Sequence, residues 1–361
     1  HRHRTVFIER FPKGLQASQQ DAYVQTFGPA LTGELFTAAH GYRGPGAGQP
    51  LTVWRPPWPQ RVDVTLDAPL APAELDHYQT LAARWQSLVQ RERWQHTRYF
   101  AYVFDEVDGP PAEGVDAGSH RRYVAMTHAE MARLQQTLDA GAPEVPLDLL
   151  WTSHSNPAQW QGDPALDLTG KIRFWAPNAS AADPAFLAER VQAGDTAWIY
   201  HSGHPSIGAH SINASGIEMR TWGVATARYG LQGQFMWAVN LGSDTRPFDE
   251  PVFRPEEDRA GNGVLVYPGN ALPQLPLLGL PATPGPIPSM RLKAWRRGLQ
   301  DAELYLLAHE QDAAGADKLI RAIMPRALAD GQGAAAWPDD PAQWLQFHRD
   351  LLRLASQGTQ S

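Results

Sequence analysis

Short runs of apolar and β-branched residues alternate along this chain with longer segments in which apolar residues recur every three or four positions. The short runs predict β-strands and the longer segments predict amphipathic helices. The predicted strands are Thr5–Glu9, Arg61–Leu66, Tyr99–Phe104, Leu147–Thr152, Lys171–Trp175, Thr196–His201, Gly233–Val239 and Gly263–Tyr267. The predicted helices between them are Ala71–Arg93, His128–Leu138, Pro184–Gln192 and Met219–Tyr229.

This alternation is typical of parallel βαβ units. The predicted strands lack a regular polar alternation, as expected where both faces of a parallel sheet are covered. Eight predicted strands in one uninterrupted stretch favour an α/β fold of the (β/α)8 type, a TIM-like barrel, over an open doubly wound sheet. We therefore predict a single catalytic-type domain over residues 1–361.

Two Pro- and Gly-rich segments, Gly41–Pro59 and Asn270–Pro288, are predicted to be loops over the barrel. A strong helix follows Pro288, with Ser289 as its predicted N-cap. Further helices are predicted at Asp317–Leu328 and Pro341–Leu354, so that C-terminal helices within 289–355 pack on the barrel.

The chain begins with His1-Arg-His-Arg4, which runs directly into the first predicted strand without an initiator Met or a signal-peptide pattern. We interpret this start as the cut end of a longer chain. The predicted barrel is therefore expected to be truncated at its N-terminus.

Composition excludes several classes of function. The formal net charge is -7 and the acidic residues are dispersed, which argues against nucleic-acid binding. No apolar run approaches the length of a membrane span. The chain has no Cys, which excludes disulfides, zinc–thiolate sites and a Cys nucleophile. The 13 Trp residues are more distinctive, because a Trp face suits stacking on a sugar ring.

Common catalytic and cofactor motifs are missing. No Gly-rich phosphate loop follows a predicted strand, and no GxSxG sequence is present. His201, His204 and His210 cluster in sequence, but the intervening Gly and Pro residues predict a loop rather than a metal-binding helix. We predict no metal site and no cofactor, and expect these histidines to contact substrate or to pack.

Asp105 and Glu106 are the strongest candidate catalytic residues. They follow the apolar run Tyr99–Phe104 and precede a predicted loop. Neighbouring side chains alternate along a strand, so this pair can share one pocket only if the strand stops there. The C-terminal end of a strand is where an α/β barrel carries its catalytic residues. The alternative is that one carboxylate caps the next element and the other is solvated.

Aromatic and amide residues lie at the ends of other predicted strands, which converge in a barrel. The predicted substrate-binding residues are Trp151, Trp175, Tyr200, His201, Trp237 and Asn240. No cluster of Arg or Lys accompanies them, so this set suits a neutral polyol better than an anion.

Several segments carry a resemblance to a known family. They are Gly261-Asn-Gly-Val-Leu-Val-Tyr267-Pro-Gly269, the helix from Pro288-Ser-Met-Arg291 through Trp295 and Asp301 to Leu307, Phe104-Asp-Glu106, Trp198-Ile-Tyr200, and Arg220-Thr-Trp222 to Gly233. Together they resemble the domain family of unknown function 4091, which forms the catalytic region of glycoside hydrolase family 123. The resemblance spans residues 95 to 310 in order.

The resemblance implies a retaining β-N-acetylhexosaminidase that acts on N-acetylgalactosaminide-type substrates by substrate-assisted catalysis. Glu106 would be the general acid/base, and Asp105 would orient the 2-acetamido group. Family members often continue Asp-Glu-Pro, whereas Val107 follows the pair here. Arg291, Asp301 and Glu303 in the C-terminal motif are expected to form ion pairs that tie their helix to the barrel.

Two alternatives remain open at this point. A glycosidase acting on a sugar without an acetamido group would need a third carboxylate near the pocket, for which Asp148 and Asp195 are the candidates. A catalytically silent carbohydrate-binding barrel would leave Asp105 and Glu106 splayed or facing solvent. The expected partner is an oligosaccharide or polysaccharide, with neither nucleic acid nor a membrane span, and this substrate class favours a periplasmic or secreted protein.

Overall fold

The computed structural model describes residues 16–44, 46–59, 68–200, 206–240, 260–269, 285–330 and 337–357. The chain divides into two compact units. The first comprises His1–Pro177 with Gln192–Thr196, and the second comprises Asn178–Val191 with Ala197–Ser361.

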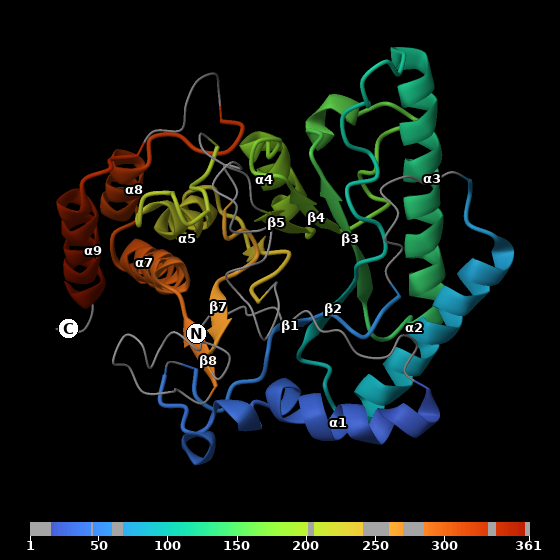
Figure 1. The fold of residues 1–361 in the computed structure, drawn as a ribbon, viewed down its shortest axis with the longest axis horizontal. Coiled ribbons are helices and arrows are strands. Elements are labelled where there is room, and N and C mark those ends of the chain that lie inside the picture. The colour runs from blue at the N-terminus through green and yellow to red at the C-terminus, as the bar shows by residue number, and fades with distance from the viewer. Residues whose placement is uncertain are drawn as a thin grey trace. The chain divides into compact units, whose positions relative to one another are not determined.

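The first unit is built from parallel strands joined by long helices (Figure 1). Strands β1 (Val53–Trp54), β2 (Arg98–Ala101), β3 (Leu147–Ser153) and β4 (Phe174–Pro177) pair in parallel in that order. The helices of this unit are α1 (Ala17–Thr32), α2 (Pro72–Glu92) and α3 (Ala117–Gly141), with the short 3-10 helices η1 (Glu34–Phe36), η2 (Ala38–His40) and η3 (Pro157–Trp160). Because α2 connects β1 to β2 and α3 connects β2 to β3, the expected βαβ alternation is confirmed here.

The core of the first unit is rich in aromatic rings. Strand β3 is buried at every position, which explains its lack of polar alternation. Helix α2 buries residues spaced three and four apart, among them Tyr78, Leu81, Trp85 and Leu88. The Trp85 ring packs edge-on against Tyr99 of β2, with ring centroids 5.2 Å apart. This packing fixes the strand that leads to the predicted catalytic pair.

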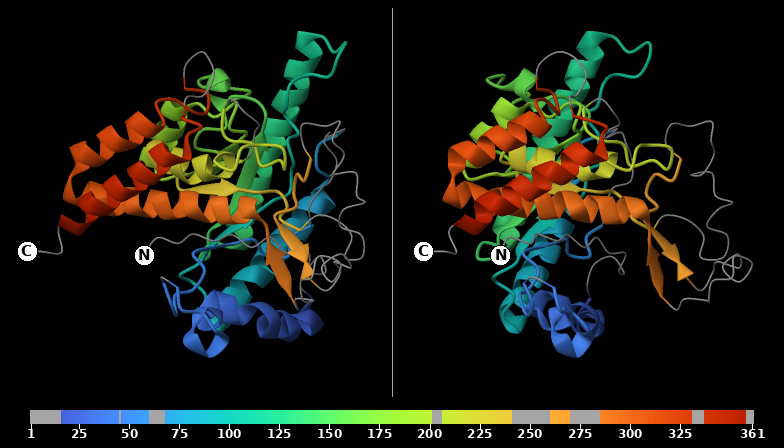
Figure 2. Two further views of the ribbon diagram at one scale, coloured as in Figure 1. Left: turned by 60° about the vertical axis from the view of Figure 1, so that its left-hand side comes forward. Right: turned by 90° about the vertical axis from the view of Figure 1, so that its left-hand side faces the viewer.

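The second unit contains a pair of parallel strands, a small antiparallel ribbon and a group of helices (Figure 2). Strands β5 (Thr196–Tyr200) and β6 (Gly233–Phe235) are parallel, whereas β7 (Val266–Pro268) and β8 (Pro286–Pro288) are antiparallel. The helices are α4 (Pro184–Gln192), α5 (Glu218–Arg228), α7 (Met290–Gln311), α8 (Ala313–Ile323) and α9 (Pro341–Ser356). Ser289 caps α7 by accepting a hydrogen bond from the Leu292 N–H, as predicted.

Helices α5 and α7 cross with their backbones in contact. A Cβ atom at Gly223 would lie 2.1 Å from the backbone of Gly298, and one at Gly298 would lie 2.2 Å from the Arg220 carbonyl oxygen. Beside this crossing, the Arg220 guanidinium donates to buried Asp301 at 2.6 Å. His348 of α9 lies 2.7 Å from the other carboxylate oxygen of Asp301. Only glycine permits this helix spacing, and the charged side chains join the three helices.

The C-terminal motif residues therefore differ in role. The ion pair expected for Asp301 is present, while Glu303 forms none with a residue that the structure describes. Arg291 does not form the expected ion pair within the described ranges. Its guanidinium instead donates to backbone carbonyl oxygens, because the start of α7 lies against the loops around residues 210 and 261.

The predicted fold class is confirmed as α/β with parallel strands and intervening helices, and the part of the chain described is consistent with a partial TIM-like barrel rather than a full (β/α)8 barrel. There, four parallel strands occur in one unit and two in the other. Within the described residues, the predicted strand Gly263–Tyr267 contributes to antiparallel pairings, namely the β7–β8 ribbon and a bridge between Val264 and Asn240. The predicted strands Thr5–Glu9 and Arg61–Leu66 and most of the predicted loop Asn270–Pro288 lie outside the described residues. Helix α1 and strand β1 were not predicted.

Replacing Gly298 by Ala should destabilise the second unit. The new methyl group has no room against the Arg220 carbonyl oxygen, 2.2 Å away, so the helices must separate, at an expected loss of about 1–3 kcal/mol in the free energy of unfolding. Urea denaturation of the full chain measures the change. Gly216→Ala is the matched control, because a Cβ atom there meets nothing within 4 Å. Equal stability of the two variants would contradict the tight crossing.

Candidate active site

Asp105 and Glu106 lie in a turn that follows β2. The strand ends at Ala101, the next three residues are buried, and the bend begins at the pair itself. Glu106 adopts a left-handed backbone conformation with φ of 53°. The Gly109 N–H closes the turn by donating to the Glu106 carbonyl oxygen at 3.2 Å. The strand therefore stops before the pair, which is the condition under which neighbouring carboxylates can serve one site.

The Asp105 carboxylate is half-buried and held by Tyr102. The Tyr102 hydroxyl donates to Asp105 Oδ1 at 2.5 Å. Burial raises the pKa of Asp105 because it disfavours the charged form, and the Tyr102 hydrogen bond opposes this by lowering it. The negative charge of neighbouring Glu106 raises the Asp105 pKa further.

The Glu106 carboxylate contacts a histidine that follows β3. His154 Nε2 lies 3.1 Å from Glu106 Oε2, and both side chains are partly exposed. The Glu106 N–H also donates to Thr152 Oγ1 at 3.4 Å. The segments that follow β2 and β3 thus come together at Glu106 and His154, and solvent reaches both side chains.

Arg55 is a residue of this site that the sequence analysis missed. It follows β1 directly, is buried, and its guanidinium lies 5.9 Å from the centroid of the Tyr102 ring. Its Nη2 donates to the Trp58 carbonyl oxygen at 3.3 Å. Burial lowers the pKa of Arg55, while the neighbouring Tyr102 and Tyr23 raise it. The available signal was a single cation inside the apolar sequence Trp54-Arg-Pro-Pro-Trp58.

A buried Asp–His contact anchors the turn that carries the catalytic candidates. Asp108 Oδ2 lies 2.7 Å from His128 Nε2 and accepts a hydrogen bond from Trp151 Nε1 at 2.8 Å. His128 Nδ1 lies 2.6 Å from the Leu166 carbonyl oxygen. Both ring nitrogens of His128 therefore lie within hydrogen-bond distance of an oxygen atom, one from the Asp108 side chain and one from the backbone. The pair joins the turn to α3 and β3.

The predicted aromatic residues of the first unit belong to its core. Trp151 and Trp175 are each 1% exposed, and their rings pack edge to face with centroids 5.5 Å apart. The Trp175 Nε1–H donates to Asp195 at 3.0 Å. In this structure both rings support the sheet, and their contact with a sugar stays a prediction.

The remaining predicted binding residues belong to the second unit or are not described. Tyr200, at the end of β5, is buried, and His201 lies outside the described residues. Trp237 and Asn240 follow β6 and are exposed, Trp237 by 42%. Trp237 therefore presents an accessible aromatic face of the kind that the prediction requires.

Asp148 and Asp195, the candidates for a third carboxylate, lie at the N-terminal ends of their strands. Asp148 occupies the second position of β3 and pairs with Arg98 at 2.9 Å and Arg173 at 2.8 Å. Asp195 directly precedes β5. Both are therefore at N-terminal strand ends, whereas Asp105 follows the C-terminal end of β2.

The described residues include no group of three or more His, Asp or Glu side chains placed to hold a metal ion. Within the same ranges, no helix combines the length and apolar character needed to cross a membrane.

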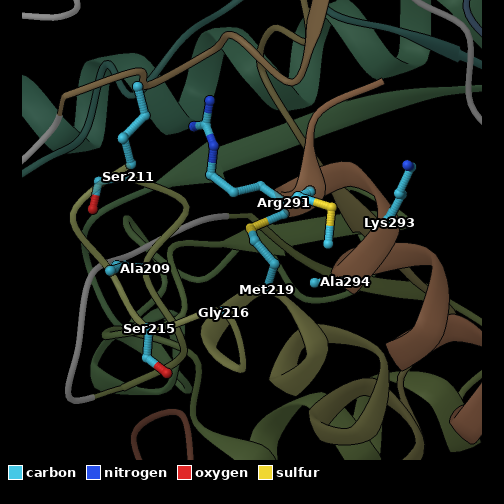
Figure 3. Close-up of a pocket in the computed structure, with 11 residues that line it drawn as sticks. Ala209, Ser211, Ser215, Gly216, Met219, Arg291, Lys293 and Ala294 are labelled. Carbon is cyan, nitrogen blue, oxygen red and sulfur yellow. The ribbon is translucent and has the colours of Figure 1, made fainter. Parts of the chain in front are cut away.

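A cavity of about 380 Å³ lies within the second unit (Figure 3). Met219 of α5 and Arg291, Lys293 and Ala294 of α7 line it, together with residues of the segment before α5. None of the predicted site residues is among its lining residues. The cavity is therefore separate from the predicted catalytic and substrate-binding side chains, although the motif residue Arg291 lines it.

Comparison with known proteins identifies the family to which part of the chain is similar. Residues 172–307 match the family model described as glycoside hydrolase 123, catalytic domain. The resemblance inferred from the motifs is thus confirmed over a segment that runs from β4 into α7. Asp105 and Glu106 precede the matched segment. No curated protein matches the chain.

Among solved structures, the chain is similar to a family 123 glycoside hydrolase from Clostridium perfringens, whose structural analysis addresses glycolipid glycan hydrolysis. The identity is 9% and the TM-score is 0.44. The match covers 80% of this chain and 45% of that one, so this chain spans less than half of the other protein's length.

Replacing Asp108 by Asn should strongly destabilise the first unit. The substitution removes the carboxylate that lies 2.7 Å from His128 Nε2 in the core, and leaving a buried polar group without its hydrogen-bond partner typically removes about 1–3 kcal/mol from the free energy of unfolding. Chemical denaturation measures the loss. Asp21→Asn, at a carboxylate 89% exposed and 3.9 Å from Arg91, is the control and should change stability little. A loss no larger than the control's would show that the pair does not anchor the turn.

Proposed function

We propose that this chain is the catalytic region of a glycoside hydrolase, specifically a retaining β-N-acetylhexosaminidase with an N-acetylgalactosaminide-type substrate. The observation that carries the proposal is the adjacent Asp105–Glu106 pair after β2, with Tyr102 on one carboxylate and His154 on the other. The similarity of residues 172–307 to a glycoside hydrolase catalytic domain supports the general class.

Glu106 is proposed as the general acid/base. In the first step, the 2-acetamido oxygen of the substrate attacks the anomeric carbon while the Glu106 carboxylic acid protonates the departing oxygen. This step breaks the glycosidic bond and gives a cyclic oxazolinium-type intermediate. In the second step, Glu106 removes a proton from water as the water oxygen attacks the anomeric carbon. The bond from that carbon to the acetamido oxygen breaks, which regenerates the acetamido group and restores the configuration. The contact with His154, 3.1 Å away, holds the Glu106 side chain in one orientation.

Asp105 is proposed to orient the acetamido group. The Tyr102 hydroxyl occupies Oδ1, which leaves Oδ2 to accept a hydrogen bond from the acetamido N–H. The negative charge of Asp105 would also stabilise the positive charge that develops on the amide as its oxygen attacks. This role requires Asp105 to be ionised in the active enzyme.

The positions of Asp148 and Asp195 favour substrate assistance over a protein nucleophile. A retaining enzyme with its own nucleophile places two carboxyl groups about 5 Å apart, on opposite faces of the scissile bond. Asp148 is tied to Arg98 and Arg173 near the start of β3, and Asp195 precedes β5. Within the described residues, neither suspect lies at the strand ends that carry the pair.

The expected substrate is a neutral amino-sugar glycan, and its source is an oligosaccharide or polysaccharide. Because such glycans lie outside the cytoplasm, a periplasmic or secreted location is part of the proposal.

The first test compares three 4-nitrophenyl β-glycosides: the N-acetylgalactosaminide, the N-acetylglucosaminide and the galactoside. The full chain should release nitrophenol only from the 2-acetamido sugars, because only these carry the internal nucleophile. Glu106→Gln should lower kcat/KM by about 10²–10⁴-fold, the usual contribution of a general acid. Release from the galactoside would rule out substrate assistance, and no release from any glycoside would count against hydrolase activity.

Tyr102→Phe should move the acid limb of the pH–rate profile to higher pH. The Tyr102 hydroxyl lowers the Asp105 pKa, so its removal raises a pKa that burial and Glu106 already raise. Activity that requires ionised Asp105 is lost as pH falls through this pKa, and the loss should begin at higher pH in the variant. The matched control is Tyr305→Phe, which removes a hydroxyl that donates to Asp317 at 2.6 Å in the second unit. An unchanged acid limb in Tyr102→Phe would show that Asp105 does not set it.

A further inference from the structure

Trp237 has an exposed ring whose orientation is fixed by a hydrogen bond. Its Nε1–H donates to Asn262 Oδ1 at 2.8 Å, while 42% of the residue remains accessible. An indole nitrogen can only donate a hydrogen bond. The contact therefore identifies the Asn262 atom beside Trp237 as the amide oxygen, which settles the orientation of the amide group.

His210 holds the same amide oxygen from the other side. Its Nε2 forms a short hydrogen bond with Asn262 Oδ1. Because that oxygen accepts only, the buried His210 ring must carry its proton on Nε2. Two donors thus share Asn262 Oδ1, and the Asn262 Nδ2 points away from both of them.

The backbone around Asn262 is held by the start of α7. The Arg291 guanidinium donates to the carbonyl oxygens of His210 at 2.6 Å and Gly261 at 2.7 Å, and also to that of Val264. On the Trp237 side, the Val239 carbonyl oxygen accepts from the Leu265 N–H at 2.7 Å. The loops that carry Trp237 and Asn262 are therefore joined to each other and to a helix, and the side chains are preorganised.

The Nδ2 group of Asn262 has two N–H donors without a partner among the residues that the structure describes. These donors lie beside a flat, accessible aromatic face. A pyranose presents the matching chemistry, because its C–H face packs on an aromatic ring and its hydroxyl or acetamido oxygens accept hydrogen bonds.

We propose that Trp237 and Asn262 form a sugar-binding subsite, with Trp237 as the stacking platform and Asn262 Nδ2 as the donor to a sugar oxygen. The ligand class is a neutral pyranose. The proposal deepens the proposed function by assigning a substrate contact to a residue of the C-terminal motif, and it rests on the sugar specificity proposed above. His210 is a positioning residue that fixes the amide and does not itself contact the sugar.

The test is direct binding of methyl β-N-acetylgalactosaminide and methyl β-galactoside to the full chain with Glu106→Gln, which removes turnover. Titration calorimetry gives the Kd, and saturation-transfer NMR reports which sugar protons touch the protein. Adding Asn262→Asp keeps oxygen acceptors for Trp237 and His210 but removes the donor. It should weaken binding about tenfold, the usual effect of losing one hydrogen bond.

Asn213→Asp is the matched control, because it introduces the same charge at an exposed Asn of the same unit and should leave Kd unchanged. Trp237→Ala should remove measurable binding and the transfer signal from the stacked sugar face. If Asn262→Asp does not fold, as judged by its near-ultraviolet circular dichroism, Trp237→Ala alone decides, since its ring is exposed and its loss need not disturb the core.

Two outcomes would overturn the subsite: equal Kd values for Asn262→Asp and its parent, or no binding of either sugar to the parent. The proposed hydrolase activity fails separately. Sugar binding that depends on Asn262, without hydrolysis of any glycoside by the unmodified chain, would support the subsite and refute the enzyme. Hydrolysis with unchanged KM and Kd in Asn262→Asp would support the enzyme and refute the subsite.

Discussion

The candidate active site depends on one buried carboxyl group. Asp108 is fully enclosed, and its carboxylate joins the His128 ring of α3 to the Trp151 indole of β3. The residues just before it make a left-handed turn at Glu106, a conformation that few side chains adopt without support. Because the anchor follows the turn so closely, it fixes where the Asp105 and Glu106 side chains emerge. The catalytic candidates are therefore partly exposed, while the backbone that carries them is attached to the core through Asp108.

Different partners prepare the two neighbouring carboxylates for different work. Asp105 receives a hydroxyl hydrogen bond in a half-buried environment, whereas Glu106 is partly exposed and contacts a histidine. A pair of titratable groups in unlike surroundings is a common basis for dividing acid/base and electrostatic roles. In the second unit, the motif residue Arg291 donates hydrogen bonds to loop carbonyl oxygens on either side of the proposed subsite.

Sequence patterns predicted the elements that have a clear period. Helices such as α2 and α5 bury residues at spacings of three and four, and the pattern located both to within a few residues. Strand β1 was missed because it has two residues inside a Pro-rich segment. The antiparallel β7–β8 pairing depends on a partner far along the chain, which local pattern does not reveal. The single-domain assignment stays a prediction.

The site residues also divide into those that a local sequence pattern identifies and those that it does not. Consecutive acids after an apolar run marked Asp105 and Glu106, but no pattern shows whether a Trp near a strand end faces a cleft or the core, as Trp151 illustrates. The glycine crossing of α5 and α7 in the second unit also influences the loops around the proposed subsite. Arg291, at the start of α7, donates hydrogen bonds to the loops that carry His210 and Asn262. The positions of these loops therefore depend on the spacing between α5 and α7. A substitution at the buried glycine crossing would therefore alter the proposed subsite without touching any residue that lines it.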